Sequence, residues 1–310
     1  MDIELRGKVD LLTENYREVR RYFRWDGKKL NILEALLYSR TGQDVEFFKV
    51  KEIRNFIKSD KANKNVFNRR FLNRFSLLYD VNKDYKKEYE NIKNVYEFLI
   101  SKGFDENEDT VLSAFVLVKR YTGLELQNRV NKLIDIKNNY KKDKSIDYTL
   151  LATLDKDIQK IKSEVDKIKY FINRIDRKDK ELFNTLIVQL MLDDREVSEN
   201  IDRISRIVDE IEKRIIPVSN NLFPMIGVTN LIVEDIDGFI KELEYVYNEM
   251  KNRKIFKYFL SKDIKLMFSM AIILDKYLEE IRADLIDLNE EAEINTLLIL
   301  EECIVFSICS

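Results

Sequence analysis

The sequence has no histidine and few of the residues that interrupt regular structure. Its 310 residues include 7 glycines, 2 prolines, 2 cysteines and 1 tryptophan. Without histidine, the Ser-His-Asp and Cys-His catalytic arrangements are excluded, and the commonest ligand of transition metals is missing. The glycines lie at least 11 residues apart, so neither a dinucleotide-binding fingerprint nor a P-loop can form. The sequence therefore indicates no catalytic constellation, and we expect no cofactor.

Features of secreted and membrane proteins are also missing. Cys303 and Cys309 are six residues apart and lack the CxxC spacing, so we interpret them as small apolar packing residues. The segment Met1–Arg6 has no apolar core of a signal peptide. Apolar runs such as Leu297–Leu300 are far shorter than the ~20 residues that span a bilayer. These features predict a cytoplasmic protein without a membrane partner.

Charge is unevenly distributed along the chain, although the net charge is only −2. Residues 1–80 carry 18 basic and 12 acidic side chains, whereas residues 232–310 carry 9 basic and 17 acidic ones. Either this gradient only reflects the composition of the chain, or it supports head-to-tail self-association.

Short apolar segments, which we call the A segments, recur at a nearly constant spacing. The centres of successive segments are 36 to 43 residues apart. Self-similarity at this period is typical of helical-repeat proteins. The central residues are Ala35, Ser76, Ala114, Ala152, Val188, Val228 and Ala271.

Longer amphipathic segments, the B segments, lie between the A segments. In one of them Ile201, Ile204, Val208 and Ile211 follow at steps of three and four, and charged residues fill the remaining positions. This pattern is typical of a surface helix with one buried stripe. The other clear B segments are 89–99, 158–175 and 240–250.

The alternation of A and B segments predicts an all-α fold. We expect an α-solenoid of about seven stacked helical hairpins. In it, the B helices form the solvated face and the A helices are sandwiched between neighbours. Residues 26–283 would form the hairpins, with capping helices at 1–25 and 284–310. No linker rich in Pro, Gly or Ser divides the chain, so we expect residues 1–310 to form a single domain. A long coiled coil is the structural alternative, but each B stripe lasts only about two heptads.

Arginines lie beside aromatic residues at two places in the N-terminal third. Arginine next to an aromatic ring can stack on bases and bind phosphates, which makes nucleic acid a conceivable ligand. Alternatively, Trp25 anchors the first helix to the first hairpin, and its two neighbours form an ion pair. The candidate partner-binding residues at these places are Arg24, Trp25, Asp26, Arg69, Arg70 and Arg74.

Polar residues interrupt several A segments. Either they hydrogen-bond to one another and to nearby turns, or they line a concave groove and meet a ligand. Asn184, Gln189 and Asn230 are candidate partner-binding residues on the second interpretation; Asn73, Thr185, Thr229 and Ser269 share the pattern. Gly227 is expected to allow close approach of two helices.

Acidic clusters at 105–109, 193–196 and 275–290 are the candidates for divalent-ion chemistry. The first lacks the glycine that an EF-hand needs at its sixth position, which is Thr110 here. Because such clusters are usually solvated helix ends and faces, we assign no metal ligand.

An amphipathic first helix ends in the Trp25–Asp26 turn and is followed by the Ala35–Tyr38 helix and the Val45–Ile57 segment. A Phe/Arg loop comes next, and then tyrosine-containing helices such as Val95–Leu99 leading to Gly103–Phe104. In this layout the chain resembles an uncharacterised bacterial family, mostly from Firmicutes, known as domain of unknown function 4003. The resemblance covers most of the chain and implies a helical cytoplasmic protein, with no particular activity.

These observations favour binding over catalysis. The first hypothesis is a non-enzymatic scaffold or adaptor that binds a protein or peptide on a helical-repeat surface. One alternative is RNA binding through the basic N-terminal end. The other is a carboxylate-metal hydrolase, which requires acidic residues of different repeats to converge.

Overall fold

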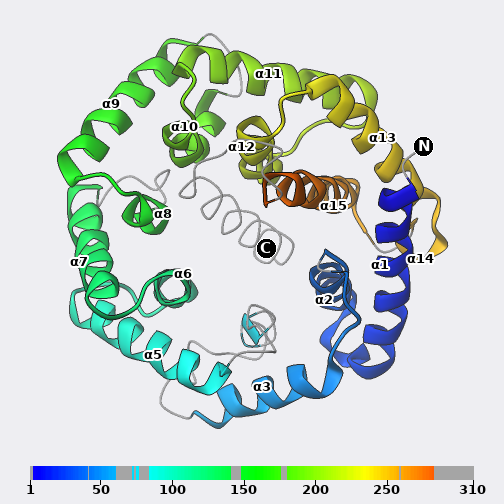
Figure 1. Cartoon of the computed structure of the whole chain (residues 1–310), viewed down its shortest axis with the longest axis horizontal. Coiled ribbons are helices and arrows are strands. Elements are labelled where there is room, and N and C mark those ends of the chain that lie inside the picture. Colours follow the sequence, from blue (N-terminus) through cyan, green and yellow to red (C-terminus); the bar gives the residue numbers. More distant parts are fainter. Residues whose placement is uncertain are drawn as a thin grey trace. The chain divides into compact units, whose positions relative to one another are not determined.

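A computed structural model describes residues 3–40, 42–60, 72, 75–76, 84–140, 148–175, 180–257 and 260–282. All regular structure in these residues is helical, with no strand among them, so the predicted all-α class is confirmed (Figure 1). The predicted C-terminal capping helix, 284–310, lies outside the described residues.

The contacts divide the chain into two compact units. Unit 1 consists of Met1–Val45 and Ser163–Ser310, and unit 2 consists of Glu46–Lys162. The boundary at the end of unit 2 falls inside helix α9 (Ile158–Arg174). The single domain predicted for residues 1–310 remains a prediction.

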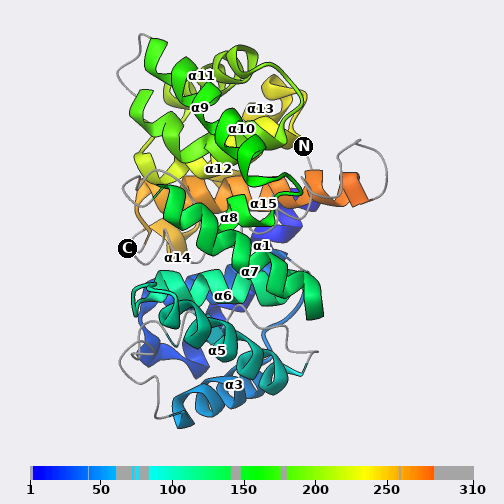
Figure 2. The same cartoon turned by 90° about the vertical axis from the view of Figure 1, so that its left-hand side faces the viewer.

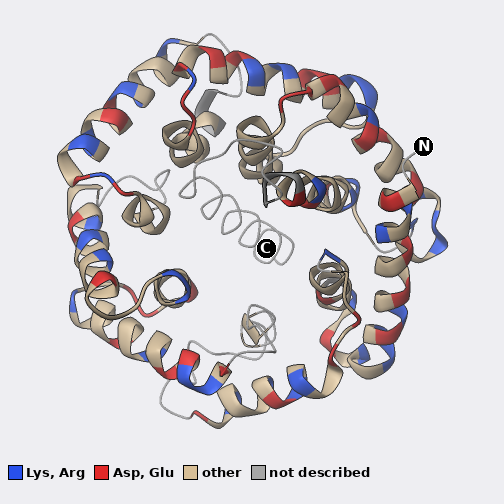
Figure 3. Cartoon of the chain, viewed as in Figure 1, with Lys and Arg blue, Asp and Glu red and all other residues tan. Residues whose placement is uncertain are grey.

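The A segments form helices that are buried nearly all round. Every residue of α10 (Ile187–Leu192) and almost every residue of α12 (Phe223–Ile232) is buried, as expected for sandwiched helices. Figure 3 shows both helices almost without charge. The other A helices are α2 (Lys28–Arg40), α6 (Glu108–Arg120), α8 (Tyr148–Thr153) and α15 (Lys262–Arg282).

The B segments form longer helices with a buried stripe and a charged face (Figure 3). In α11 (Val197–Arg214) the predicted stripe of Ile201, Ile204, Val208 and Ile211 is buried. The further long helices are α1 (Ile3–Tyr22), α3 (Phe47–Ser59), α5 (Tyr85–Ser101), α7 (Gly123–Tyr140) and α13 (Ile236–Asn252); the shorter elements are η1 (Arg24–Asp26), η3 (Lys180–Leu186), η4 (Asn220–Leu222) and α14 (Lys254–Lys257).

Five of the B helices pack against the A helix that follows them. In unit 2, α5 packs on α6 and α7 on α8; in unit 1, α1 packs on α2, α11 on α12 and α13 on α15. Aspartates cap the starts of B helices: Asp84 accepts from the amide of Lys87, and Asp235 from that of Gly238.

Unit 1 brings the beginning of the chain against its later part. Helix α1 packs on α13 and α15 as well as on α2, and α15 also contacts α2 (Figures 1 and 2). In an open solenoid each repeat contacts only its neighbours in sequence. Helix α1 is therefore present as predicted, but the structure does not place it at the free end of an array.

Two glycines have the roles that the sequence predicts. Gly103 follows α5 with a φ of 84°, which an L side chain rarely adopts. At Gly227 in α12 a Cβ atom would lie 2.8 Å from Leu186 Cδ2 and 3.1 Å from Gln189 Cγ. The absence of a side chain at Gly227 therefore allows α12 to approach η3 and α10. None of the described helices is both long enough and apolar enough to cross a membrane.

Candidate functional site

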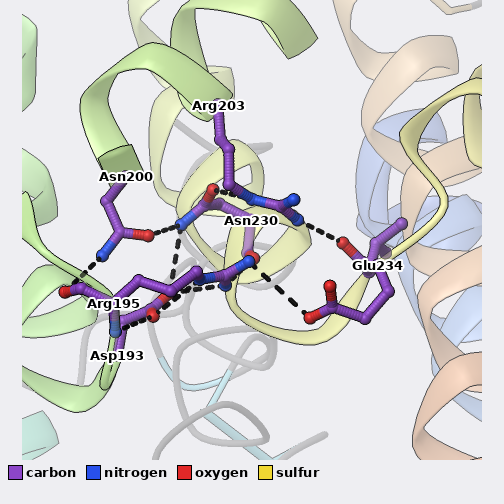
Figure 4. A network of polar contacts seen from close by, with 7 residues as sticks. Asp193, Arg195, Asn200, Arg203, Asn230 and Glu234 are labelled. Carbon is purple, nitrogen blue, oxygen red and sulfur yellow. Dashed lines mark hydrogen bonds and ion pairs between the residues drawn. The ribbon is translucent and has the colours of Figure 1, made fainter. Parts of the chain in front are cut away.

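A network of polar side chains connects the α10–α11 link, α11 and the C-terminal end of α12 within unit 1 (Figure 4). At its base Arg195 forms a two-point ion pair with Asp193: Nε donates to Oδ1 at 2.8 Å and Nη2 to Oδ2 at 2.6 Å. The same Nη2 donates to the backbone carbonyl of Asn230 at 2.6 Å. The carboxylate and the hydrogen bonds raise the pKa of Arg195, so its charge is fixed.

Asn230, a candidate ligand residue, is enclosed in this network and is only 3% exposed. Its Nδ2 donates to Oδ1 of Asn200 at 2.8 Å and to Oδ2 of Asp193 at 3.3 Å. Its Oδ1 accepts from Nε of Arg203 at 3.3 Å. All hydrogen-bonding groups of the Asn230 amide are therefore used by the protein itself.

Arg203 of α11 completes the network at the end of α12. Its Nη2 donates to the carbonyl of Val233 at 2.7 Å, which satisfies one of the free carbonyls at the C-terminus of a helix. Burial, followed by repulsion from Arg195, lowers the pKa of Arg203. A guanidinium remains charged even so, and it lies at the negative end of the helix dipole.

The same kind of contact recurs in two other B-to-A pairs. In unit 2, Arg129 of α7 donates to the carbonyls of Thr153 and Leu154, at 3.3 and 2.6 Å, at the end of α8. In unit 1, Asn15 of α1 donates to the carbonyl of Gln43, at 2.9 Å, beyond the end of α2. A polar side chain of a B helix thus binds the C-terminal end of the next A helix in three pairs.

The other polar residues of the A helices differ in their surroundings. Thr229 and Ser269 donate to carbonyls one turn back in their own helices, at 2.9 and 2.8 Å. Gln189 is buried beside Gly227, and its Oε1 has no hydrogen-bond partner. Asn184 is partly exposed in η3. Asn73 lies outside the described residues.

The turn between α1 and α2 exposes an aromatic side chain. Trp25 is 77% exposed, and the guanidinium of Arg24 lies over its ring, 4.5 Å from the centroid. The alternative interpretation, in which Trp25 anchors the first helix to the first hairpin, is wrong because the ring is not buried. Asp26 is partly exposed. Arg69, Arg70 and Arg74 lie outside the described residues.

Described carboxylates of the acidic clusters pair with basic side chains or lie at helix ends, and residues 283–290 of the third cluster lie outside the described residues. Asp193 pairs with Arg195, and Asp275 pairs with Arg40. Within the described ranges, no three Asp, Glu or Cys side chains come together as a possible metal site.

Sequence reasoning missed Asn200, Arg195 and Arg203. The only signal for Arg195 was its place inside the acidic run at 193–196, where a buried carboxylate needs a cationic partner. Arg203 and Asn200 belong to an amphipathic helix whose polar positions look alike in sequence, and nothing there distinguishes a buried polar side chain from a solvated one.

The fold and these contacts define an all-helical protein of paired helices with internally satisfied polar networks. The profile of the family described as Protein of unknown function (DUF4003) matches residues 15–303. The chain therefore belongs to this family, as the resemblance in helix layout indicates. No curated protein and no solved structure matches the chain significantly.

Proposed function

We propose that the protein is a bacterial, cytoplasmic helical-repeat scaffold that binds an acidic protein or peptide segment at the η1 turn, without catalysis. The observation that carries this proposal is the exposure of Trp25 under Arg24. Tryptophan and arginine are the residue types most enriched in the energetic centres of protein interfaces. A large aromatic ring that a short turn exposes to water contributes the most binding free energy when a partner covers it.

The charge around the turn supports an acidic partner. The exposed basic residues there are Arg17, Arg20, Arg21, Arg24 and Lys28, against the carboxylates of Glu14, Glu18 and Asp26. Tyr22, the last residue of α1, is half exposed, with the guanidinium of Arg21 5.7 Å from its ring centroid. An extended segment rich in Glu and Asp would pair with these cations, and its apolar residues would cover the two rings.

The repeat architecture supports the scaffold role. Stacked units are expected to show three features found here: a period of about forty residues, the pairing of five B helices with the next A helix, and the recurring contact at the ends of A helices. As part of this proposal, the chain forms a full α-solenoid of about seven hairpins.

Because Trp25 is the only tryptophan, its fluorescence reports directly on the proposed surface. We expect a synthetic peptide of alternating Glu and Leu to shift the emission to shorter wavelength, with an affinity that falls as salt rises. Trp25→Ala and Arg24→Met should each lose captured partners from a lysate. The matched control is Tyr170→Ala, which removes another exposed ring with an arginine, Arg174, 5.2 Å from its centroid. An unchanged emission, together with an identical set of partners for Trp25→Ala, would contradict the proposal.

The second candidate is binding of single-stranded RNA at the same turn. The stacking of Arg24 on Trp25 favours it, since bases stack on such rings. The Trp25 emission distinguishes the two candidates. If single-stranded oligonucleotides quench it and the acidic peptide leaves it unchanged, the ligand is RNA. Loss of Arg69 and Arg70 should then weaken binding and reduce its salt dependence.

A further inference from the structure

Unit 1 carries two surfaces of opposite charge at the ends of its long helices. The acidic surface consists of residues 193–199 and 234–237, the links that lead into α11 and α13 with the first residues of these helices. It holds seven acidic side chains and one basic one, a net charge of −6. The basic surface consists of residues 20–28, at the turn after α1, and residues 251–257, at the end of α13 and in α14. It holds eight basic side chains and one acidic one, a net charge of +7.

The polar network holds the two parts of the acidic surface side by side (Figure 4). Nη1 of Arg195, the basic residue of this surface, lies 3.6 Å from Oε1 of Glu234, and its Nη2 is 2.6 Å from Oδ2 of Asp193. With Arg206 counted as well, which pairs with Asp237 at 2.9 Å, the surface remains strongly negative. Its exposed carboxylates are those of Asp194, Glu196, Glu199, Glu234, Asp235 and Asp237.

Contacts between α1 and α14 connect the two parts of the basic surface. The ring of Tyr16, six residues before the end of α1, lies 6.4 Å from that of Phe256 in α14. Arg253 is used within the protein, where it pairs with Asp10 at 2.6 Å and with Glu249 at 3.5 Å. The exposed basic side chains of this surface include Arg20, Arg21, Arg24, Lys28, Lys254 and Lys257, and the exposed ring of Trp25 lies in the same turn.

The length of α13 keeps the two surfaces apart in one chain. Acidic residues favour the start of a helix and basic residues its end, so α13 has one surface at each end. Its 17 residues span about 25 Å. This is well beyond the Debye length of about 8 Å at physiological ionic strength. The two surfaces therefore do not neutralise each other within a single chain.

We propose that the acidic surface of one copy of the chain binds the basic surface of a second copy, with Trp25 covered at the contact. The nearly equal and opposite net charges bring the two copies together in this orientation, and burial of the tryptophan ring adds binding free energy. The inference rests on the proposed function, because it identifies the acidic partner of the η1 turn as a second copy. Since the two surfaces differ, the contact is heterologous, and each copy binds one neighbour through each surface.

The first test uses the unmutated full chain. Light scattering at low salt should give an average mass that rises with protein concentration and passes that of a dimer, and sodium chloride should return it to that of the monomer. Over the same concentrations the emission of Trp25 should shift to shorter wavelength. A chain that stays monomeric at low salt, while the acidic peptide still shifts the emission, would overturn this inference and leave the proposed function standing.

Charge reversal tests which surfaces meet. Arg20→Glu with Arg24→Glu makes the η1 turn acidic, and Asp194→Lys with Glu234→Lys makes the two links basic. Each double variant alone should need at least about tenfold more protein to associate, because its two surfaces now repel between copies.

An equimolar mixture of the two variants should associate again, since every surface then finds one of opposite charge. Recovery in the mixture also shows that both variants are folded. Lys167→Glu with Lys241→Glu, at exposed positions outside both surfaces, changes the net charge as much as the first variant does and should associate like the original chain. A mixture that remains monomeric, or association that survives either reversal, contradicts the proposed contact.

Discussion

Arg40 of α2 and Asp275 of α15 form a two-point ion pair across 235 residues of sequence. Nε of Arg40 lies 2.8 Å from Oδ2 and Nη2 lies 2.7 Å from Oδ1, and both side chains are about 90% buried. This pair joins the first A helix of unit 1 to the last one. Removing the carboxylate of Asp275 takes away the two-point partner of a buried guanidinium.

We therefore predict that Asp275→Asn lowers the free energy of unfolding by about 3–5 kcal/mol. Replacing both residues, as in Arg40→Met with Asp275→Leu, should restore most of this loss because no unpaired charge remains. Urea denaturation provides the measurement. Lys276→Met is the control, since its pair with Glu242 is about one quarter exposed and contributes about 1 kcal/mol or less. A double variant no more stable than Asp275→Asn would contradict this explanation.

Gly227→Ala should destabilise unit 1 by about 1–3 kcal/mol, because the new methyl group would overlap Leu186 and crowd Gln189. Gly7→Ala is the matched control in α1, where a Cβ atom meets nothing within 4 Å. The control should stabilise the protein by about 0.5–1 kcal/mol through the higher helix propensity of alanine. Equal thermal stability of the two variants would show that α12 has room at this position.

Asn230→Leu should cost about 2–3 kcal/mol, because Asn200 and Arg203 then lose a partner inside the protein. Arg206→Met, which removes an ion pair with Asp237 that is more than half exposed, should change the stability by less than about 0.5 kcal/mol. Chemical denaturation of both variants compares the two effects directly. If Asn230→Leu is as stable as Arg206→Met, the network does not stabilise the end of α12.

Stability should fall at alkaline pH through tyrosines of α5. Burial, together with the hydrogen bond from its hydroxyl to Glu52, raises the pKa of Tyr85 to about 12. Burial and the carboxylate of Asp60 also raise the pKa of Tyr89. Since the unfolded chain ionises near 10, the folded state binds more protons above this pH. The stabilisation is complete below pH 10 and is lost as pH rises to about 12.

Absorbance at the phenolate band should show Tyr85 ionising at about pH 12 in the folded protein. In Tyr85→Phe this ionisation should be missing, and unfolding should become less dependent on pH between 10 and 12. An unaltered alkaline titration for Tyr85→Phe would show that another tyrosine is responsible.

Local structure was predictable because it depends on patterns within one segment. The 3.6-residue stripe of residues 201–211 predicts α11, and the apolar run of residues 187–192, interrupted only by Gln189, predicts a buried helix. Contacts between distant segments leave no such pattern. Nothing in the sequence links Arg40 to Asp275. Asn230 was noticed as a polar residue in an apolar segment, yet whether it faced a ligand or Asn200 depended on how α11 packs.

The packing of α1 and α2 against α13 and α15 also determines when unit 1 can form during synthesis. The chain of unit 2, residues 46–162, is continuous and is complete while the second part of unit 1 is still being made. The first two helices must therefore exist for about two hundred residues of elongation without the surfaces that later cover them. Arg40 lacks its ion-pair partner Asp275 until α15 has left the ribosome, and wrong contacts can form in this time. Contacts between residues that are far apart in the sequence slow folding. In a chain truncated before α13, we expect unit 2 to be folded while α1 and α2 of unit 1 stay uncovered.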